Sequence, residues 1–301
     1  DLDSGDRKMQ DEVKKMINRM LELPDSYLLN NNLYSDYGLF IKERNLSVQY
    51  PYEYLDDIEL NLYDEEMDYP ILYGYMDVQD DIVPKMRALL IDWLIDVTFR
   101  YNFNDEVIHL TCFIIDYYLT KIIIKRDSLQ LIGACSLLIA TKFHEIKPPL
   151  INDLVFISDQ AYQYDDVIKN EFEILQKINF SINLPCCLSF FQLFSCKLGF
   201  DKFKINYGMF LLETALLEYE YLRFKPSVRS LSVCYLLLDT NDDNTMNVYK
   251  ILESSNNPKI IKECISKFQN IFEYRPDSNV CNFKAVRKKY TSEKYLMVAL
   301  V

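Results

Sequence analysis

Apolar residues recur every three or four positions along most of the chain, which is the pattern of packed amphipathic helices. The first half predicts helices at residues 85–101, 105–121, 128–145, 150–156 and 165–178, and the second half predicts helices at 186–198, 205–221, 226–239, 247–252 and 257–273. In each half the third helix is the most apolar, so we expect it to lie at the centre of the others. Shorter helices are predicted at 54–67 and 284–290. The sequence therefore predicts an all-α protein with two similar five-helix units of about 100 residues each.

Residues 86–100, MRALLIDWLIDVTFR, predict a helix with two apolar faces instead of one. At about 100° per residue, one stripe contains Met86, Leu89, Leu90, Trp93 and Val97, and the other contains Ala88, Ile91, Leu94 and Ile95. One stripe can face the core, and the other must meet a second helix or a partner. Arg87 falls within the second stripe, where a guanidinium needs a carboxylate.

Asp116 is the carboxylate that the pattern offers to Arg87, because it lies among apolar positions of the helix at 105–121. We expect a buried ion pair that joins the first two helices of the first unit. The alternative is that each side chain reaches solvent separately.

Lys142 and Glu171 also lie on apolar helix faces. If their helices are neighbours, an ammonium and a carboxylate flank a hydrophobic surface built from Ile139, Phe143, Leu175 and Ile182. Such a surface suits a partner helix that presents an apolar side chain and the free main-chain groups of its end. The alternative is an ordinary internal salt bridge.

Composition narrows the classes of function. Six glycines in 301 residues disfavour glycine-rich phosphate loops and β architecture, and a net charge of −12 disfavours nucleic acid as the main ligand and favours a basic protein partner. The eight cysteines lie mostly in apolar runs without a CxxC pair, which predicts reduced core residues of an intracellular protein. No signal peptide or membrane-spanning apolar run is visible. The chain begins at Asp1 instead of Met, which is compatible with a fragment.

Residues suited to catalysis are scarce. His109 and His144 have no Cys or second His at metal-ligand spacing, and we expect both to face solvent or lie at the boundary of the core. Phosphate-loop, dinucleotide, kinase and nucleophile-elbow motifs are missing from the sequence. The sequence therefore predicts no catalytic residue, no metal and no cofactor, and it disfavours an enzyme.

Four segments, MRALLIDWLIDV, LTCFIIDYYL, LQLIGACSLLIATKFHEIKPP and EFEILQKINFSI, resemble the A/B-type mitotic cyclins in order and spacing. The resemblance extends upstream to Tyr54 and downstream to the C-terminal AVRKKYTSEKYLMVAL. It implies tandem five-helix cyclin boxes. The expected layout is a weakly ordered segment at 1–53, a helix and connector at 54–83, cyclin boxes at 84–183 and 184–276, and a C-terminal helix and tail at 277–301.

The resemblance also implies a function. A cyclin binds and activates a cyclin-dependent serine/threonine kinase in cell-cycle control without supplying a catalytic residue, in the nucleus or the cytoplasm. The kinase-binding positions that it implies are Lys142, Glu171, Ile139, Phe143, Leu175 and Ile182, with His144 and Glu145 beside them. A docking groove for substrates and inhibitors with Arg-x-Leu motifs is implied at Met86, Leu89, Leu90, Trp93, Asp96, Gln130 and Asp159.

Two departures from the family pattern bear on these expectations. His144 stands where mitotic cyclins usually have a second glutamate, which leaves the choice of kinase open. Residues 1–50 contain neither an R-x-x-L destruction box with its downstream Asn nor a KEN box. The alternative functions are a transcription-factor-like cyclin fold that binds DNA, or a partner of a transcriptional kinase. The acidic charge and the complete contact sets at Lys142/Glu171 and Met86/Trp93 weigh against DNA binding. The M-R-x-x-L-x-x-W segment, which transcriptional cyclins generally lack, weighs against a partner of a transcriptional kinase.

Overall fold

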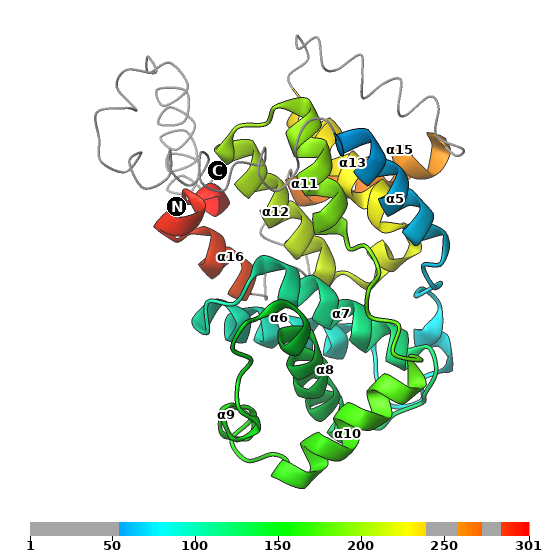
Figure 1. Ribbon diagram of the computed structural model, residues 1–301, viewed down its shortest axis with the longest axis vertical. Coiled ribbons are helices and arrows are strands. Elements are labelled where there is room, and N and C mark those ends of the chain that lie inside the picture. Colours follow the sequence, from blue (N-terminus) through cyan, green and yellow to red (C-terminus); the bar gives the residue numbers. More distant parts are fainter. Residues whose placement is uncertain (1–53, 239–257, 273–283, 301) are drawn as a thin grey trace, which may run out of the picture.

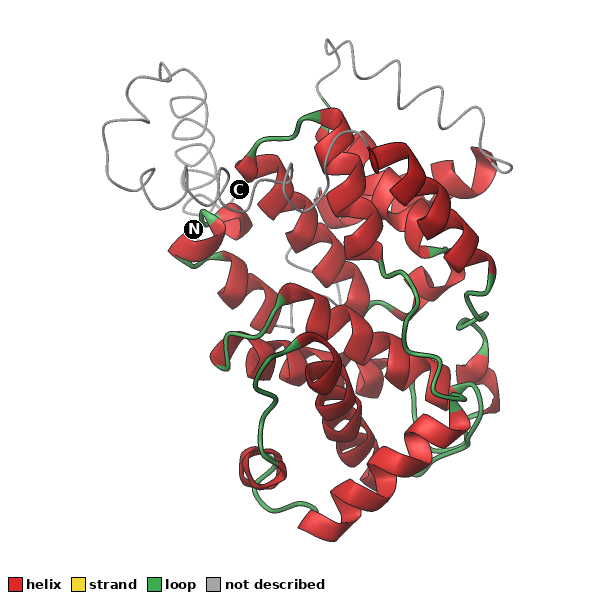
Figure 2. Ribbon diagram, viewed as in Figure 1, coloured by secondary structure: helices red, strands yellow, loops and turns green. Residues whose placement is uncertain are grey.

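The computed structural model describes residues 54–238, 258–272 and 284–300 of the chain. Over these ranges the regular secondary structure is helical, without a strand (Figure 2). The all-α prediction is confirmed. The segment at 1–53 and the helix predicted at 247–252 lie outside the described residues.

All five helices predicted for the first unit are present (Figure 1). They are α6 (Pro84–Arg100), α7 (Asp105–Leu119), α8 (Leu129–His144), α9 (Ile151–Ile157) and α10 (Tyr164–Lys177). Helix α8 is central, because every residue from Ile132 to Thr141 is buried and the helix contacts α6, α7 and α10. Gly133 allows α6 to approach closely, since a Cβ there would lie 2.7 Å from Leu90 Cδ1.

The second unit repeats the arrangement with α11 (Cys187–Leu198), α12 (Lys202–Leu217), α13 (Pro226–Leu237) and α15 (Pro258–Phe272). Helix α13 is again central and contacts the other three. The helix predicted at 205–221 starts earlier, because the Asp201 side chain accepts a hydrogen bond from Lys204 N at 2.8 Å and caps the first turn. It stops at Leu217, and a 3-10 turn, η4 (Tyr219–Arg223), follows.

Two flanking helices tie the units together (Figure 1). Helix α5 (Leu55–Met67) precedes the first unit in sequence but packs on α11 and α13 of the second. Its buried Glu66 accepts hydrogen bonds from Ser227 N at 2.7 Å and from Ser227 Oγ at 2.5 Å, which holds the start of α13. Helix α16 (Ala285–Tyr290) lies on both α6 and α12.

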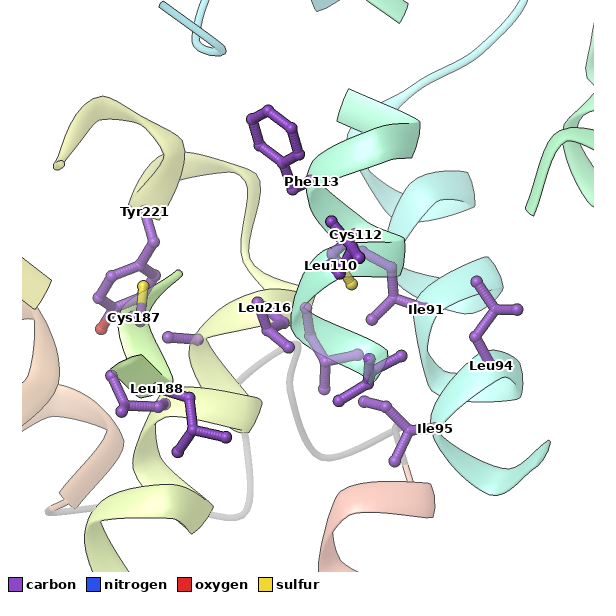
Figure 3. Close-up of a cluster of buried hydrophobic side chains, with 14 of the residues drawn as sticks. Ile91, Leu94, Ile95, Leu110, Cys112, Phe113, Cys187, Leu188, Leu216 and Tyr221 are labelled. Carbon is purple, nitrogen blue, oxygen red and sulfur yellow. The ribbon is translucent and has the colours of Figure 1, made fainter. Parts of the chain in front are cut away.

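The interface between the units is apolar. Figure 3 shows Leu110 and Cys112 of α7 gathered with Leu216 of α12 and Leu188 of α11, and all four side chains belong to one continuous core. The seven cysteines within the described ranges are free thiols, six of them buried, as the sequence predicts. None of the described helices is long and apolar enough to cross a membrane.

The short 3-10 turns complete the path of the chain. They are η2 (Tyr75–Val78), η3 (Arg126–Ser128), η6 (Glu293–Tyr295) and η7 (Val298–Leu300). Turn η2 follows Gly74, whose φ of +102° suits glycine, and Tyr219 Oη accepts hydrogen bonds from the main-chain N–H groups of Gly74 and Met76. The connector before α6 is thereby fixed to the second unit.

Candidate functional site

Arg87 and Asp116 form the buried ion pair that the sequence predicts. Nε of Arg87 lies 2.6 Å from Oδ1 of Asp116, and Nη2 lies 2.6 Å from Oδ2, so the contact is bidentate. Each side chain is only 1% exposed, which excludes the alternative in which they reach solvent separately. Burial acts to lower the pKa of Arg87, but the adjacent Asp116 carboxylate more than offsets it and raises that pKa above its ordinary value.

The ion pair has two further partners that the sequence pattern did not indicate. Tyr75 Oη donates to Asp116 Oδ1 at 2.8 Å, and Arg87 Nη1 donates to the main-chain oxygen of Leu216 at 2.8 Å. Leu216 belongs to α12, so the pair also links the first unit to the second. We infer that it fixes the relative position of α6, α7 and α12.

Lys142 and Glu171 meet at the surface where the last turn of α8 faces α10. Lys142 Nζ lies 2.5 Å from Glu171 Oε1. The Lys142 side chain is 48% exposed and that of Glu171 is 15% exposed. The salt bridge of the alternative interpretation is therefore present, but at the surface instead of inside. Both charged groups can reach a partner.

The apolar residues beside this pair differ in accessibility. We define the Lys142 surface as Lys142, Phe143, Glu171, Leu175 and Ile182. Phe143 is exposed, and Leu175 and Ile182 are partly buried. The expectation that Ile139 also presents its side chain is wrong: it is 3% exposed, because α8 is enclosed by its neighbours up to Thr141.

Helix α10 adds exposed apolar residues that the sequence reasoning missed. Tyr164, Ile168 and Phe172 recur every fourth residue and are each about half exposed. They lie on the same helix as Glu171 and Leu175 and extend the apolar area beside the Lys142 surface. Their spacing of four residues, which places them on one face of a helix, was the sequence signal that could have identified them.

His144 and Glu145, at the end of α8, are held to the start of α7. Glu145 Oε1 accepts a hydrogen bond from Asn104 N at 2.6 Å, and His144 Nδ1 lies 3.4 Å from Glu106 Oε2. The His144 ring also meets Phe143 edge to face, with 5.0 Å between the ring centroids. His144 is a boundary residue, as predicted.

The prediction that His109 lies at the surface or boundary is wrong. Its side chain is buried, because α7 is covered by α8, α11 and α12 and almost every residue from Val107 to Leu119 is enclosed. Burial, with the nearby charges of Lys289 and Arg229, lowers the pKa of His109 to about 3. The imidazole is therefore neutral at ordinary pH.

The outer stripe of α6 is only partly open. After the expectation from the sequence, we use the name α6 groove for the positions Met86, Leu89, Trp93, Gln130 and Asp159. Leu89 and Asp159 are exposed, and the other three are partly buried.

Two residues expected in the groove are placed differently. Leu90 is 7% exposed, because it packs against Gly133 of α8. Asp96 is not a free acid: it pairs with Lys288 of α16 at 2.8 Å and with Arg100 at 2.5 Å. The groove acid that remains accessible is Asp159.

Comparison with known proteins gives a consistent result. The family model "Cyclin, N-terminal domain" matches residues 57–183, and "Cyclin, C-terminal domain" matches residues 185–301. The G2/mitotic-specific cyclin-B of Spisula solidissima is 33% identical over 82% of this chain and 57% of its own length. That of Hydra vulgaris is 34% identical over 83% of this chain and 66% of its own length. The chain thus spans roughly three fifths of these relatives.

A solved structure shows the same fold. The viral cyclin from herpesvirus saimiri superposes with a TM-score of 0.60 at 19% sequence identity. The match covers 73% of this chain and 99% of the viral protein. The structural similarity therefore extends beyond the first helical unit into the second.

Proposed function

We propose, from the premise that the chain belongs to the cyclin family, that it is a non-catalytic regulatory subunit that binds and activates a cyclin-dependent serine/threonine kinase. The similarity to G2/mitotic-specific B-type cyclins supports a role in cell division, in the nucleus or cytoplasm. The observation that carries the proposal is the pair of accessible opposite charges, Lys142 and Glu171, bordering exposed apolar side chains.

The chemistry of this surface fits the end of a partner helix. An ammonium can donate to the free carbonyl groups of a helix end, and a carboxylate can accept from free N–H groups. When a partner binds, the Lys142–Glu171 ion pair is exchanged for these contacts. The exchange costs little free energy, because an exposed ion pair contributes only about 0–1 kcal/mol of stability. Phe143 and the apolar face of α10 supply the hydrophobic contact.

Reconstitution with a purified cyclin-dependent kinase catalytic subunit tests the proposal. We expect a one-to-one complex by size-exclusion chromatography and a large rise in phosphorylation of a histone-type peptide. The proposal would be contradicted if the chain and each cell-division kinase tested eluted separately and the kinase activity did not change. Duplex DNA at low salt is the matched test of the alternative function, and the net charge of −12 predicts no binding.

We further propose that the α6 groove recruits substrates or inhibitors with Arg-x-Leu motifs. Leu89 and the partly buried Met86 and Trp93 offer apolar contact for the leucine, and Asp159 offers a carboxylate for the basic residue. Asp96 is left out of this proposal, because Lys288 and Arg100 already neutralise it.

A Met86→Ala, Leu89→Ala and Trp93→Ala variant should lower kcat/KM several-fold for a full-length substrate that carries Arg-x-Leu. A short peptide without the motif should be phosphorylated normally, because docking acts by raising the local concentration of the phosphorylation site. Asp159→Lys should act in the same direction. Phe156→Ala, which alters an exposed apolar residue on α9, is the control. Equal losses on both substrates would show that the stripe serves packing alone.

A further inference from the structure

A cavity of about 150 Å³ lies between the two helical units. Its wall includes Leu110 and Phe113 of α7, Ile182 and Leu184 of the segment joining the units, and Tyr69 after α5. Phe143 and His144 also line it, so it reaches the Lys142 surface. A cavity of about this volume can hold a molecule of the size of benzene.

Arg229 of α13 lines the same cavity and is 5% exposed. No acidic side chain in the described part of the chain forms an ion pair with it, and its Nε has no hydrogen-bond partner. The guanidinium donates a hydrogen bond to the Tyr69 hydroxyl oxygen. Burial does not make arginine neutral, because the guanidinium keeps its proton in proteins. A buried guanidinium without a counter-charge is strongly unfavourable.

Two other buried cations in the described ranges are paired with carboxylates. Arg87 has Asp116, and Lys289 has Glu213 at 2.5 Å and Asp105 at 2.8 Å. Arg229 is thus a buried cation that lines the cavity and has no carboxylate paired with it in the described part of the chain.

Among the described residues, three acidic side chains, Asp116, Glu65 and Glu106, also line the cavity, and Asp116 alone is paired with a cation. Both oxygens of Asp116 bond Arg87. Glu65 Oε1 accepts from Asn61 Nδ2 at 3.0 Å, and Glu106 lies beside His144 and Asn104. Hydrogen bonds from neutral amides leave Glu65 and Glu106 charged, but Arg229 is the one arginine or lysine on the cavity wall in the part of the chain that the structure describes, so it is the group with which a bound anion would pair.

We propose that this cavity binds a small apolar carboxylate, whose anionic group pairs with Arg229 and whose hydrocarbon part packs between Leu110, Phe113 and Leu184. The carboxylate would meet the guanidinium fork, the geometry that arginine recognises best. The neutral His109 and the Tyr69 hydroxyl, which line the same wall, are additional hydrogen-bonding groups. The site is separate from the α6 groove, and its occupancy does not require a kinase.

Benzoate is the probe and benzamide its neutral, isosteric control, both titrated into the full chain by calorimetry and thermal unfolding. We expect benzoate to bind and to raise the unfolding midpoint as its concentration exceeds Kd, and benzamide to bind at least tenfold more weakly. Arg229→Met should reduce benzoate affinity at least tenfold. Arg223→Met, which removes an exposed arginine of η4, should leave it unchanged.

Two outcomes would overturn the proposal. One is equal binding of benzoate and benzamide to the wild-type chain, or no binding of either. The other is an unfolding midpoint that falls clearly in Arg229→Met without ligand, because removal of an uncompensated buried charge should keep or raise it. A fall would mean that Arg229 already has a counter-charge within the protein. The comparison of benzoate with benzamide needs no variant, so a folding defect cannot obscure it.

Discussion

An Asp116→Ala variant is expected to lose about 3–5 kcal/mol of its free energy of unfolding, because it leaves the Arg87 guanidinium buried without a counter-charge. The loss should be large because both side chains are enclosed and both carboxylate oxygens are used. Tyr75 also loses its acceptor, which adds an unpaired buried hydroxyl. Urea unfolding followed by circular dichroism measures the effect.

A double-mutant cycle with Arg87→Met and Asp116→Leu isolates the pair. We expect a coupling energy of about 1–3 kcal/mol and a double variant that is more stable than Asp116→Ala, because both charges are removed together. The exposed Arg126–Asp81 pair, with Nε and Oδ1 2.7 Å apart, is the matched control. Its Asp81→Ala variant should lose no more than about 1 kcal/mol. Zero coupling between Arg87 and Asp116 would mean that the contact does not stabilise the fold.

The helices and this ion pair were predictable because the signals are local. Helical periodicity is set by the 3.6-residue repeat, and capping residues such as Asn104 fix the ends within a few residues. Two ionisable residues on apolar faces of consecutive helices have few ways to avoid burial unpaired, so Arg87 and Asp116 could be matched from sequence. Their further link to the Leu216 carbonyl depends on how the second unit docks, and no local pattern encodes that.

Most of the site predictions that failed depend on long-range packing. Asp96 is neutralised by Lys288, which lies 192 residues away in the chain, and also by Arg100, four residues along the same helix, a local pair that the sequence reasoning overlooked. The burial of Leu90 follows from Gly133 on another helix. His109 is enclosed because the second unit covers α7, a surface that the first unit alone would leave open. Periodicity identifies the face of a helix, but it does not identify what covers that face.

Lys142→Glu and Glu171→Lys are each expected to weaken kinase binding about 30-fold or more. Loss of one hydrogen-bonded charge at a protein interface typically costs about 2–5 kcal/mol, and each reversal also adds repulsion. The fold should survive, because Lys142 is half exposed and Glu171 still reaches solvent. Binding to the catalytic subunit and phosphorylation of a short peptide are the measurements, with circular dichroism to verify folding.

The double variant Lys142→Glu with Glu171→Lys separates the two interpretations of this pair. It restores an ion pair within the protein but inverts its polarity toward a partner. In the double variant a carboxylate faces the partner's carbonyl groups and an ammonium faces its N–H groups, so both contacts become repulsive. We therefore expect kinase activation to remain lost. The same exchange at the exposed Arg223–Glu263 pair of the second unit should leave activation intact. If the inverted pair at Lys142 and Glu171 activates the kinase fully, the pair serves only the internal packing of α8 against α10, and the kinase contact must lie elsewhere.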